Sequence, residues 1–176
     1  TGCRARIDVI AGTSAGGING AALALSQANR KARLSDLRDI WTDQGQIDTL
    51  LRRPFRGSPA SLLRGDAYFL PRLNEAMQRL ATPFEPTDPR ERPIDLTITA
   101  TLLNGVQKVT VDSTGQRLPQ WVHDGRFRFR RGVAESVTTS AAPVDPFSPG
   151  HIHATADQLA LAARCTASFP VAFEPS

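Results

Sequence analysis

A short apolar run that leads directly into a serine flanked by glycines is the strongest constraint on how this chain folds. Residues 7–11 read Ile-Asp-Val-Ile-Ala, and residues 12–16 read Gly-Thr-Ser-Ala-Gly. Apolar, β-branched residues followed by Gly-x-Ser-x-Gly and then by small residues predict a strand, a tight turn and a helix. Ser14 stands at that turn, so the pattern predicts a nucleophile elbow.

The chemistry of such an elbow explains the residue types around Ser14. The turn is too tight for side chains two residues away on either side, so Gly12 and Gly16 are expected to remove Cβ atoms that would collide. Ser14 then lies at the start of a helix, where the dipole and free N–H groups favour negative charge on a bound carbonyl oxygen. We expect the Ala15 N–H to be one of these oxyanion donors, and Ser14 to be the catalytic nucleophile.

Two other structures remain open for this motif. One is a glycine-rich turn with an incidental serine, and the other is a loop that cradles phosphate. A Walker-type phosphate loop requires Gly-Lys-Ser/Thr, and residues 12–17 contain no lysine. The apolar run before the motif and the Ala/Leu run at residues 21–25 favour the elbow.

The composition limits the class of protein. The chain has 176 residues, of which 40% are hydrophobic, so we expect residues 1–176 to form a single domain with a substantial core. No apolar run reaches the length of about 18 residues that a membrane-spanning helix needs. Because the sequence begins at Thr1 rather than Met, we expect residues to be missing before it, and a lost signal peptide stays open.

The charge pattern argues against a nucleic-acid partner. The formal net charge of +4 comes mainly from arginine, since Lys31 and Lys108 are the only lysines. The nearest candidate for a basic patch interleaved with aromatics is residues 126–131, Arg-Phe-Arg-Phe-Arg-Arg. This alternation fits a surface strand with phenylalanines on one face and arginines on the other, although contact with an anionic lipid surface stays open. We therefore expect no nucleic acid, and peripheral membrane contact remains an alternative.

The cysteines give a weaker signal. Cys3 and Cys165 lack the spacing of metal ligands, which predicts no metal and is typical of a reducing or indifferent compartment. We expect a cytoplasmic protein, with peripheral attachment to a membrane left open, and no cofactor.

Periodicity predicts strands alternating with helices, and thus an α/β three-layer fold. The expected helices lie at residues 15–32, from Ser35 to near Gly45, from Asp66 to Leu80 with Pro71 near its start, and from Thr155 to Cys165. The expected strands lie at residues 94–101, returning over 106–111 after an Asn104-Gly105 hairpin turn, and in a second hairpin around Asp124-Gly125.

Two separated segments of the chain resemble one family, the patatin-like phospholipases, which are lipid acyl hydrolases. Residues 8–17 resemble their elbow, and residues 162–175, Ala-Ala-Arg-Cys-Thr-Ala-Ser-Phe-Pro-Val-Ala-Phe-Glu-Pro, resemble their later helix-to-loop segment. Residues 97–102 and the following Asn-Gly are similar to the strand between the two. The resemblance covers about a third of the chain and implies a three-layer α/β sandwich with a central, mostly parallel sheet.

The resemblance also implies a mechanism with a Ser–Asp dyad. Ser14 matches the family's serine. The family's aspartate follows the segment that resembles residues 162–175, in Asp-Gly-Gly or Asp-Gly-Ala, and its oxyanion loop precedes the elbow strand. Neither motif occurs at those places in this chain. We therefore expect a central part of a lipid-degrading catalytic domain, truncated at both ends. It would act on lipid or acyl esters without a metal, and residues 1–176 alone would hydrolyse esters poorly.

The sequence also offers candidates for the residues that would contact the acyl chain of the substrate and for a different dyad aspartate. Leu23 and Leu25, with Phe169 and Phe173, are candidates to line an acyl slot, although a pure core role is equally open for each. Asp124 is an alternative dyad acid, but it precedes the second family-like segment and its Asp-Gly context indicates a turn.

Two other functions stay open. One is an α/β-hydrolase-type esterase whose triad would be Ser14, Asp145 and either His151 or His153, because these residues follow the order Ser, acid, His. The other is a non-catalytic lipid-binding or scaffold domain that retains the elbow.

Overall fold

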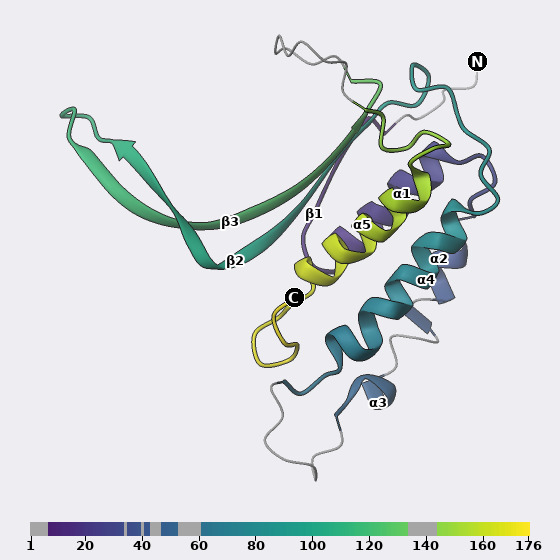
Figure 1. Cartoon of the computed structure of the whole chain (residues 1–176), viewed down its shortest axis with the longest axis horizontal. Coiled ribbons are helices and arrows are strands. Elements are labelled where there is room, and N and C mark those ends of the chain that lie inside the picture. Colours follow the sequence, from purple (N-terminus) through teal and green to yellow (C-terminus); the bar gives the residue numbers. More distant parts are fainter. Residues whose placement is uncertain (1–6, 34, 40, 43–46, 53–60, 134–143) are drawn as a thin grey trace, which may run out of the picture.

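The computed structural model describes residues 7–33, 35–39, 41–42, 47–52, 61–133 and 144–176. Within them the chain forms a three-stranded sheet with helices packed on one face (Figure 1). The strands are β1 (Val9–Gly12), β2 (Ile94–Val111) and β3 (Arg117–Arg131), in the spatial order β1-β2-β3. β1 runs parallel to β2, and β2 runs antiparallel to β3.

The helices form a layer beside this sheet. They are α1 (Ala15–Ala28), α2 (Ser35–Asp39), α3 (Ile47–Leu50), the π-helical turn η2 (Gly65–Phe69), α4 (Leu70–Ala81) and α5 (Ile152–Thr166). α1 and α5 contact the sheet directly, and α4 packs against both of them. Beyond the end of β1, strands β2 and β3 continue as a long ribbon that extends away from the helices (Figure 1).

The core follows from the alternation of apolar and polar residues in β2. Ile94, Leu96 and Ile98 are buried, while the residues between them lie on the other face. The helical stripe predicted over the 66–80 segment is also buried, since Leu73, Met77 and Leu80 belong to the same core. This burial fixes the register of β2 and, through the pairing of Gly12 with Ile98, the position at which β1 ends.

The α/β class predicted from the sequence is confirmed, and two details can be added. Phe129 on β3 is buried and Phe127 is partly buried, whereas Arg128 is exposed and donates hydrogen bonds to Asp95, as the Arg-Phe alternation predicts. The described helices cover one face of a mixed sheet. A second helical layer on the opposite face, where Asp95 and Thr97 lie, is not among the described residues.

Both predicted hairpin turns are wrong. β2 runs through Asn104-Gly105, and the chain reverses over residues 112–116, where Asp112 Oδ1 accepts hydrogen bonds from Thr114 and Gln116. Gly105 has a φ of 62° within a register shift between Thr101 and Val106, so it belongs to a β-bulge instead of a turn.

The second Asp-Gly also lies inside a strand. Gly125 is buried in β3, and a Cβ there would lie 3.2 Å from both the Ala100 carbonyl oxygen and Leu102 Cδ2. The absence of a side chain therefore allows β2 and β3 to approach closely at this point.

Three helix boundaries differ from the sequence expectation. α1 ends at Ala28 instead of residue 32. α4 begins at Leu70, directly before Pro71, and the π-helical turn η2 precedes it. α5 begins at Ile152 instead of at Thr155, because the Thr155 hydroxyl donates to the Pro146 carbonyl oxygen and caps no helix.

Candidate active site

The backbone of Ser14 is strained. Its φ is 54° and its ψ is −127°, a conformation that costs a residue with a side chain about 1–3 kcal/mol. Contacts on both sides hold it there. The Ser14 N–H donates to Thr166 Oγ1 over 2.8 Å, and the Ser14 carbonyl oxygen accepts from the N–H groups of Gly17 and Ile18. The elbow predicted between strand and helix is therefore formed, with Ser14 at its apex.

The side chain of Ser14 is left free by this arrangement. Serine at the N-cap of a helix usually accepts a hydrogen bond from the first turn. Ser14 occupies the N-cap of α1 but makes no such bond, and it is exposed. The first turn of α1 also lacks an acidic residue, so no carboxylate there offsets the positive end of the helix dipole. A hydroxyl in this position can approach a carbonyl carbon.

The glycines around the elbow have different steric roles. A Cβ on Gly12 would lie 2.3 Å from the Gly16 carbonyl oxygen, so the collision predicted at Gly12 is found. A Cβ on Gly16 would meet nothing within 4 Å, so the collision predicted there is absent. Gly17 is the second crowded position, because a Cβ on it would lie 2.6 Å from Thr166 Cγ2.

The N–H groups that follow Ser14 differ in their availability. The Gly16 N–H donates to the Thr13 carbonyl oxygen, and the Gly17 N–H donates to that of Ser14. The described residues offer no hydrogen-bond partner to the Ala15 N–H. Ala15, which was singled out as an oxyanion donor from the sequence, therefore has an N–H at the helix N-terminus that is available to a ligand.

Two threonines anchor the elbow, and the motif itself does not reveal either of them. Thr13 Oγ1 lies 2.5 Å from Thr99 Oγ1 on β2, and Thr166 at the end of α5 binds the Ser14 N–H. Thr166 is separated from Ser14 by 152 residues. The signal that points to Thr166 is its place in the second family-like segment.

The Thr166 hydrogen bond yields a testable expectation. Thr166→Val keeps the shape of the side chain but removes the acceptor of the Ser14 N–H. We expect it to lower the free energy of unfolding by about 1–3 kcal/mol, because a partly buried donor loses its partner. Thr166→Ser keeps the oxygen and is the matched control. If urea denaturation gave equal losses for both variants, the threonine methyl group rather than the hydrogen bond would be responsible.

The histidine triad considered from the sequence is wrong. Ser14 binds Thr166 at the C-terminal end of α5, whereas His151 and His153 lie at its N-terminal end. α5 has 15 residues, and at about 1.5 Å per residue it separates the two ends by about 20 Å. Asp145 also lies at the far end, where it pairs with Arg131 over 3.4 Å.

Asp124 is engaged elsewhere. It lies on β3 opposite Thr101 and forms ion pairs with Lys108 at 3.4 Å and with Arg126 at 3.3 Å. Within the described residues, the hydrogen bonds of Ser14 use only its backbone. No carboxylate of the described residues is therefore placed against the Ser14 hydroxyl.

The segment after α5 is attached to residues 61–66 by charged and aromatic contacts. Arg164 is completely buried (0% exposed), and its guanidinium pairs with Asp66 over 3.1 Å and donates to the Glu174 carbonyl oxygen over 2.8 Å. The same group lies 5.1 Å from the ring centre of Phe173, which stacks on Phe69. Phe173 is therefore partly buried against Phe69 and Arg164, whereas Phe169 is exposed.

Glu174 also contacts this segment, through Asp66 and Arg52, and the pKa of its carboxyl is lowered. Burial opposes its ionisation, but hydrogen bonds from the Ser61 hydroxyl, the Asp66 N–H and the Arg52 guanidinium outweigh it. They lower the pKa of the carboxyl from 4.5 to about 2. Arg52 also pairs with it over 3.0 Å.

This lowered pKa predicts a pH dependence of stability. A carboxyl whose pKa is lower in the folded state than in the unfolded state stabilises the fold as long as it is ionised. For Glu174 this contribution is fully present above the unfolded pKa of 4.5, and it disappears as the pH falls through the folded pKa of about 2. We expect Glu174 to contribute about 2–3 kcal/mol at neutral pH through this shift. Urea midpoints measured at about pH 6 and about pH 2.5 should differ less for Glu174→Gln than for the parent chain. An equal difference would contradict the assignment.

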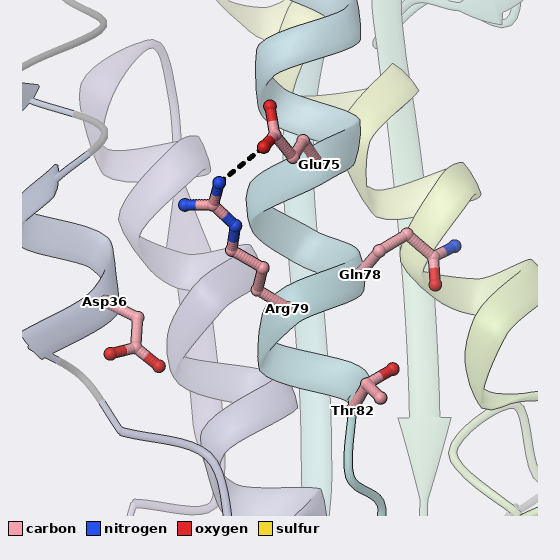
Figure 2. Close-up of a pocket in the computed structure, with 5 residues that line it drawn as sticks. All are labelled: Asp36, Glu75, Gln78, Arg79 and Thr82. Carbon is pink, nitrogen blue, oxygen red and sulfur yellow. Dashed lines mark hydrogen bonds and ion pairs between the residues drawn. The ribbon is translucent and has the colours of Figure 1, made fainter.

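The hollow in Figure 2 does not belong to the elbow. It has a volume of about 610 Å³ and is lined by Asp36, Glu75, Gln78, Arg79 and Thr82. Arg79 pairs with Glu75 on α4, and Thr82 follows α4 near the end of α1 that is farthest from Ser14. The five residues that line it have polar or charged side chains, and none of them belongs to the elbow.

The described residues contain neither a candidate metal site nor a candidate membrane-spanning helix. They contain no group of three or more histidine, cysteine, aspartate or glutamate side chains that could hold a metal ion. No helix among them is both long enough and apolar enough to cross a membrane.

The chain that forms this α/β sheet and strained strand–serine–helix elbow matches a known protein family. The sequence model of the patatin-like phospholipases matches residues 1–176, and the chain belongs to that family. It is 40% identical over 175 residues to a protein of Mycobacterium tuberculosis (strain ATCC 25618 / H37Rv) named "Uncharacterized membrane protein Rv3479". That alignment covers 97% of this chain and 15% of the relative. No solved structure matches.

Proposed function

We propose that residues 1–176 carry the nucleophile of a serine acyl hydrolase that cleaves ester bonds of lipids, in the manner of a phospholipase A or esterase. The observation that carries the proposal is the strained Ser14 at the N-terminus of α1, with a free hydroxyl beside the free N–H of Ala15. Family membership supports lipid esters as the substrate class.

The proposed reaction uses Ser14 and an aspartate outside residues 1–176. The aspartate takes the proton of the Ser14 hydroxyl while Oγ attacks the ester carbonyl carbon. The negative charge that develops on the carbonyl oxygen is stabilised by the Ala15 N–H and the positive end of α1. The aspartate passes this proton to the alcohol as the alcohol leaves. Water then hydrolyses the acyl-serine, which releases the fatty acid and restores the Ser14 hydroxyl.

A second function is favoured by one observation. Within the described residues, no acid contacts the Ser14 hydroxyl, which is also what a non-catalytic lipid-binding or scaffold domain would show. The relative is named a membrane protein, which supports peripheral membrane contact for either function. We further propose a cytoplasmic location and chemistry without a metal.

The test compares residues 1–176 with an extended protein that also carries the dyad aspartate and the upstream oxyanion loop. On a p-nitrophenyl ester we expect the shorter chain to be slower by about 10³-fold or more, because it lacks a base and part of the oxyanion site. Turnover by residues 1–176 at the rate of the extended protein, abolished by Ser14→Ala, would overturn the dyad. Absence of hydrolysis by both would favour the scaffold function. Chelation of metals should leave the rate unchanged.

A further inference from the structure

Ser14 holds a conformation that a serine at the start of a helix does not normally adopt. Such a serine has an extended backbone, and its hydroxyl accepts a hydrogen bond from the second or third N–H of the helix. Ser14 has a φ of 54° and makes no such bond. The Gly17 N–H, which a capping hydroxyl would bind, donates to the Ser14 carbonyl oxygen instead. The ordinary capped conformation therefore competes with the elbow, and it would occupy the nucleophile.

The peptide group between Thr13 and Ser14 decides between these two conformations, because its orientation sets the φ of Ser14. Its N–H donates to Thr166 Oγ1 over 2.8 Å, and its carbonyl oxygen accepts from the Gly16 N–H over 3.0 Å. Strained backbone persists only where the surrounding structure over-determines it. At this peptide the additional constraint is the Thr166 side chain, which comes from a different element, α5.

Thr166 is packed closely enough to hold this peptide. It is buried (9% exposed) at the end of α5, which packs beside α1 (Figure 1). A Cβ on Gly17 would lie 2.6 Å from Thr166 Cγ2 and 3.2 Å from Thr166 Oγ1. The missing side chain at Gly17 therefore allows the threonine to reach the N–H of the nucleophile.

A second threonine holds the residue before Ser14 from the sheet. Thr13 Oγ1 lies 2.5 Å from Thr99 Oγ1 on β2. The strand pairing ends one residue earlier on each strand, at Gly12 and Ile98, so the hydroxyl contact extends the attachment of β1 to β2 by one residue. Consecutive residues of the elbow are thus held by two different layers, Thr13 by the sheet and Ser14 by the helices.

We infer that Thr166 and Thr99 are positioning residues that prevent the Ser14 hydroxyl from capping its own helix. While both threonine hydroxyls are present, the peptide before Ser14 keeps its orientation and the Ser14 hydroxyl stays available to an ester carbonyl. Without them, we expect this peptide to turn and the Ser14 hydroxyl to accept from the Gly17 N–H. The consequence for catalysis rests on the proposed function, whereas the conformational preference does not.

The test is a double-mutant cycle on the stability of residues 1–176, measured by urea denaturation. In the parent chain, Ser14→Ala should change the unfolding equilibrium constant by less than about twofold, because the hydroxyl makes no capping bond. The same change should raise this constant about fivefold in Thr166→Val and about threefold or more in Thr99→Val, because it then removes a helix cap. Thr155→Val is the matched control, since it removes a threonine hydroxyl bond at the other end of α5 and should leave Ser14→Ala neutral.

Hydrolysis by the extended protein separates positioning from support of the fold alone. Thr166→Val should lower kcat by about tenfold or more and leave KM within about twofold, because the nucleophile is misplaced while the substrate still binds. Thr166→Ser keeps the hydroxyl, so it should restore kcat and make Ser14→Ala neutral again. Loss of stability in Thr166→Val with an unchanged kcat would show that this threonine supports only the fold.

Two results of the cycle would overturn the inference. One is a neutral Ser14→Ala in both Thr166→Val and Thr99→Val, and the other is an equal response in Thr155→Val. Circular dichroism shows whether each variant folds, and Thr99→Val carries the cycle if Thr166→Val does not fold. Absence of hydrolysis by the extended protein would contradict the proposed function and leave the cycle unaffected, so the two failures are distinguishable.

Discussion

Ser14→Ala is expected to lower ester hydrolysis by the extended protein by about 10⁴-fold or more, because a dyad without its nucleophile retains only binding and oxyanion contacts. The fold should survive, since the Ser14 hydroxyl makes no capping bond and the residue is exposed. Rates on a p-nitrophenyl ester, with urea denaturation of the same samples, check both parts.

Two variants serve as controls for this prediction. Ser26→Ala removes a serine hydroxyl from the same helix, where it donates to the Leu23 carbonyl oxygen, and should keep the activity. Ser14→Gly should be inactive but more stable than Ser14→Ala by about 1 kcal/mol, because glycine accepts the positive φ of 54°. Hydrolysis that survives in Ser14→Ala would exclude this serine as the nucleophile.

Gly12→Ala is expected to destabilise the protein by about 3 kcal/mol or more and to abolish the elbow geometry. The new Cβ would lie 2.3 Å from the Gly16 carbonyl oxygen and 2.7 Å from the Gly17 nitrogen, and both are backbone atoms of the first turn of α1. Relief therefore requires the strand and the helix to move apart. Urea denaturation measures the loss.

Gly16→Ala is the matched control at the other glycine of the motif. A Cβ there meets nothing within 4 Å, and alanine favours a helix over glycine by about 1 kcal/mol. We expect it to be as stable as the parent chain or more so. Equal destabilisation at both glycines would contradict the steric assignment.

Local patterns predicted the strand–turn–helix geometry around Ser14 because the strand, the turn and the start of the helix lie within about ten residues, although Thr99 and Thr166, which anchor the turn, lie far away in the sequence. The strand, the crowded position at Gly12 and the start of α1 follow from chain-local sterics, which spacing encodes, whereas the collision predicted at Gly16 is absent. Residues 94–98 and 126–131 were predictable for the same reason, since alternation reports burial of one face. Gly17 was missed because its crowding comes from Thr166, which is remote in sequence.

The errors occur where pairing with distant residues overrides a local signal. Asn104-Gly105 is a strong turn signal, but β2 continues through it because residues 106–111 pair with residues 117–122 of β3. The predicted start of a helix at Thr155 was wrong, because the Thr155 hydroxyl donates to the Pro146 carbonyl oxygen and α5 begins at Ile152. The histidine alternative satisfied chain order alone, and only the length of α5 shows that the histidines lie far from Ser14.

The most direct test of the central claim is covalent labelling of the extended protein with a fluorophosphonate, followed by mass spectrometry of its peptides. We expect one adduct, on the peptide that contains Ser14, and none in Ser14→Ala, because only an activated serine attacks the phosphorus. The Ser26→Ala control should label like the parent protein. An adduct on a different residue, or ester hydrolysis that persists while Ser14 stays unlabelled, would contradict the assignment of Ser14 as the nucleophile.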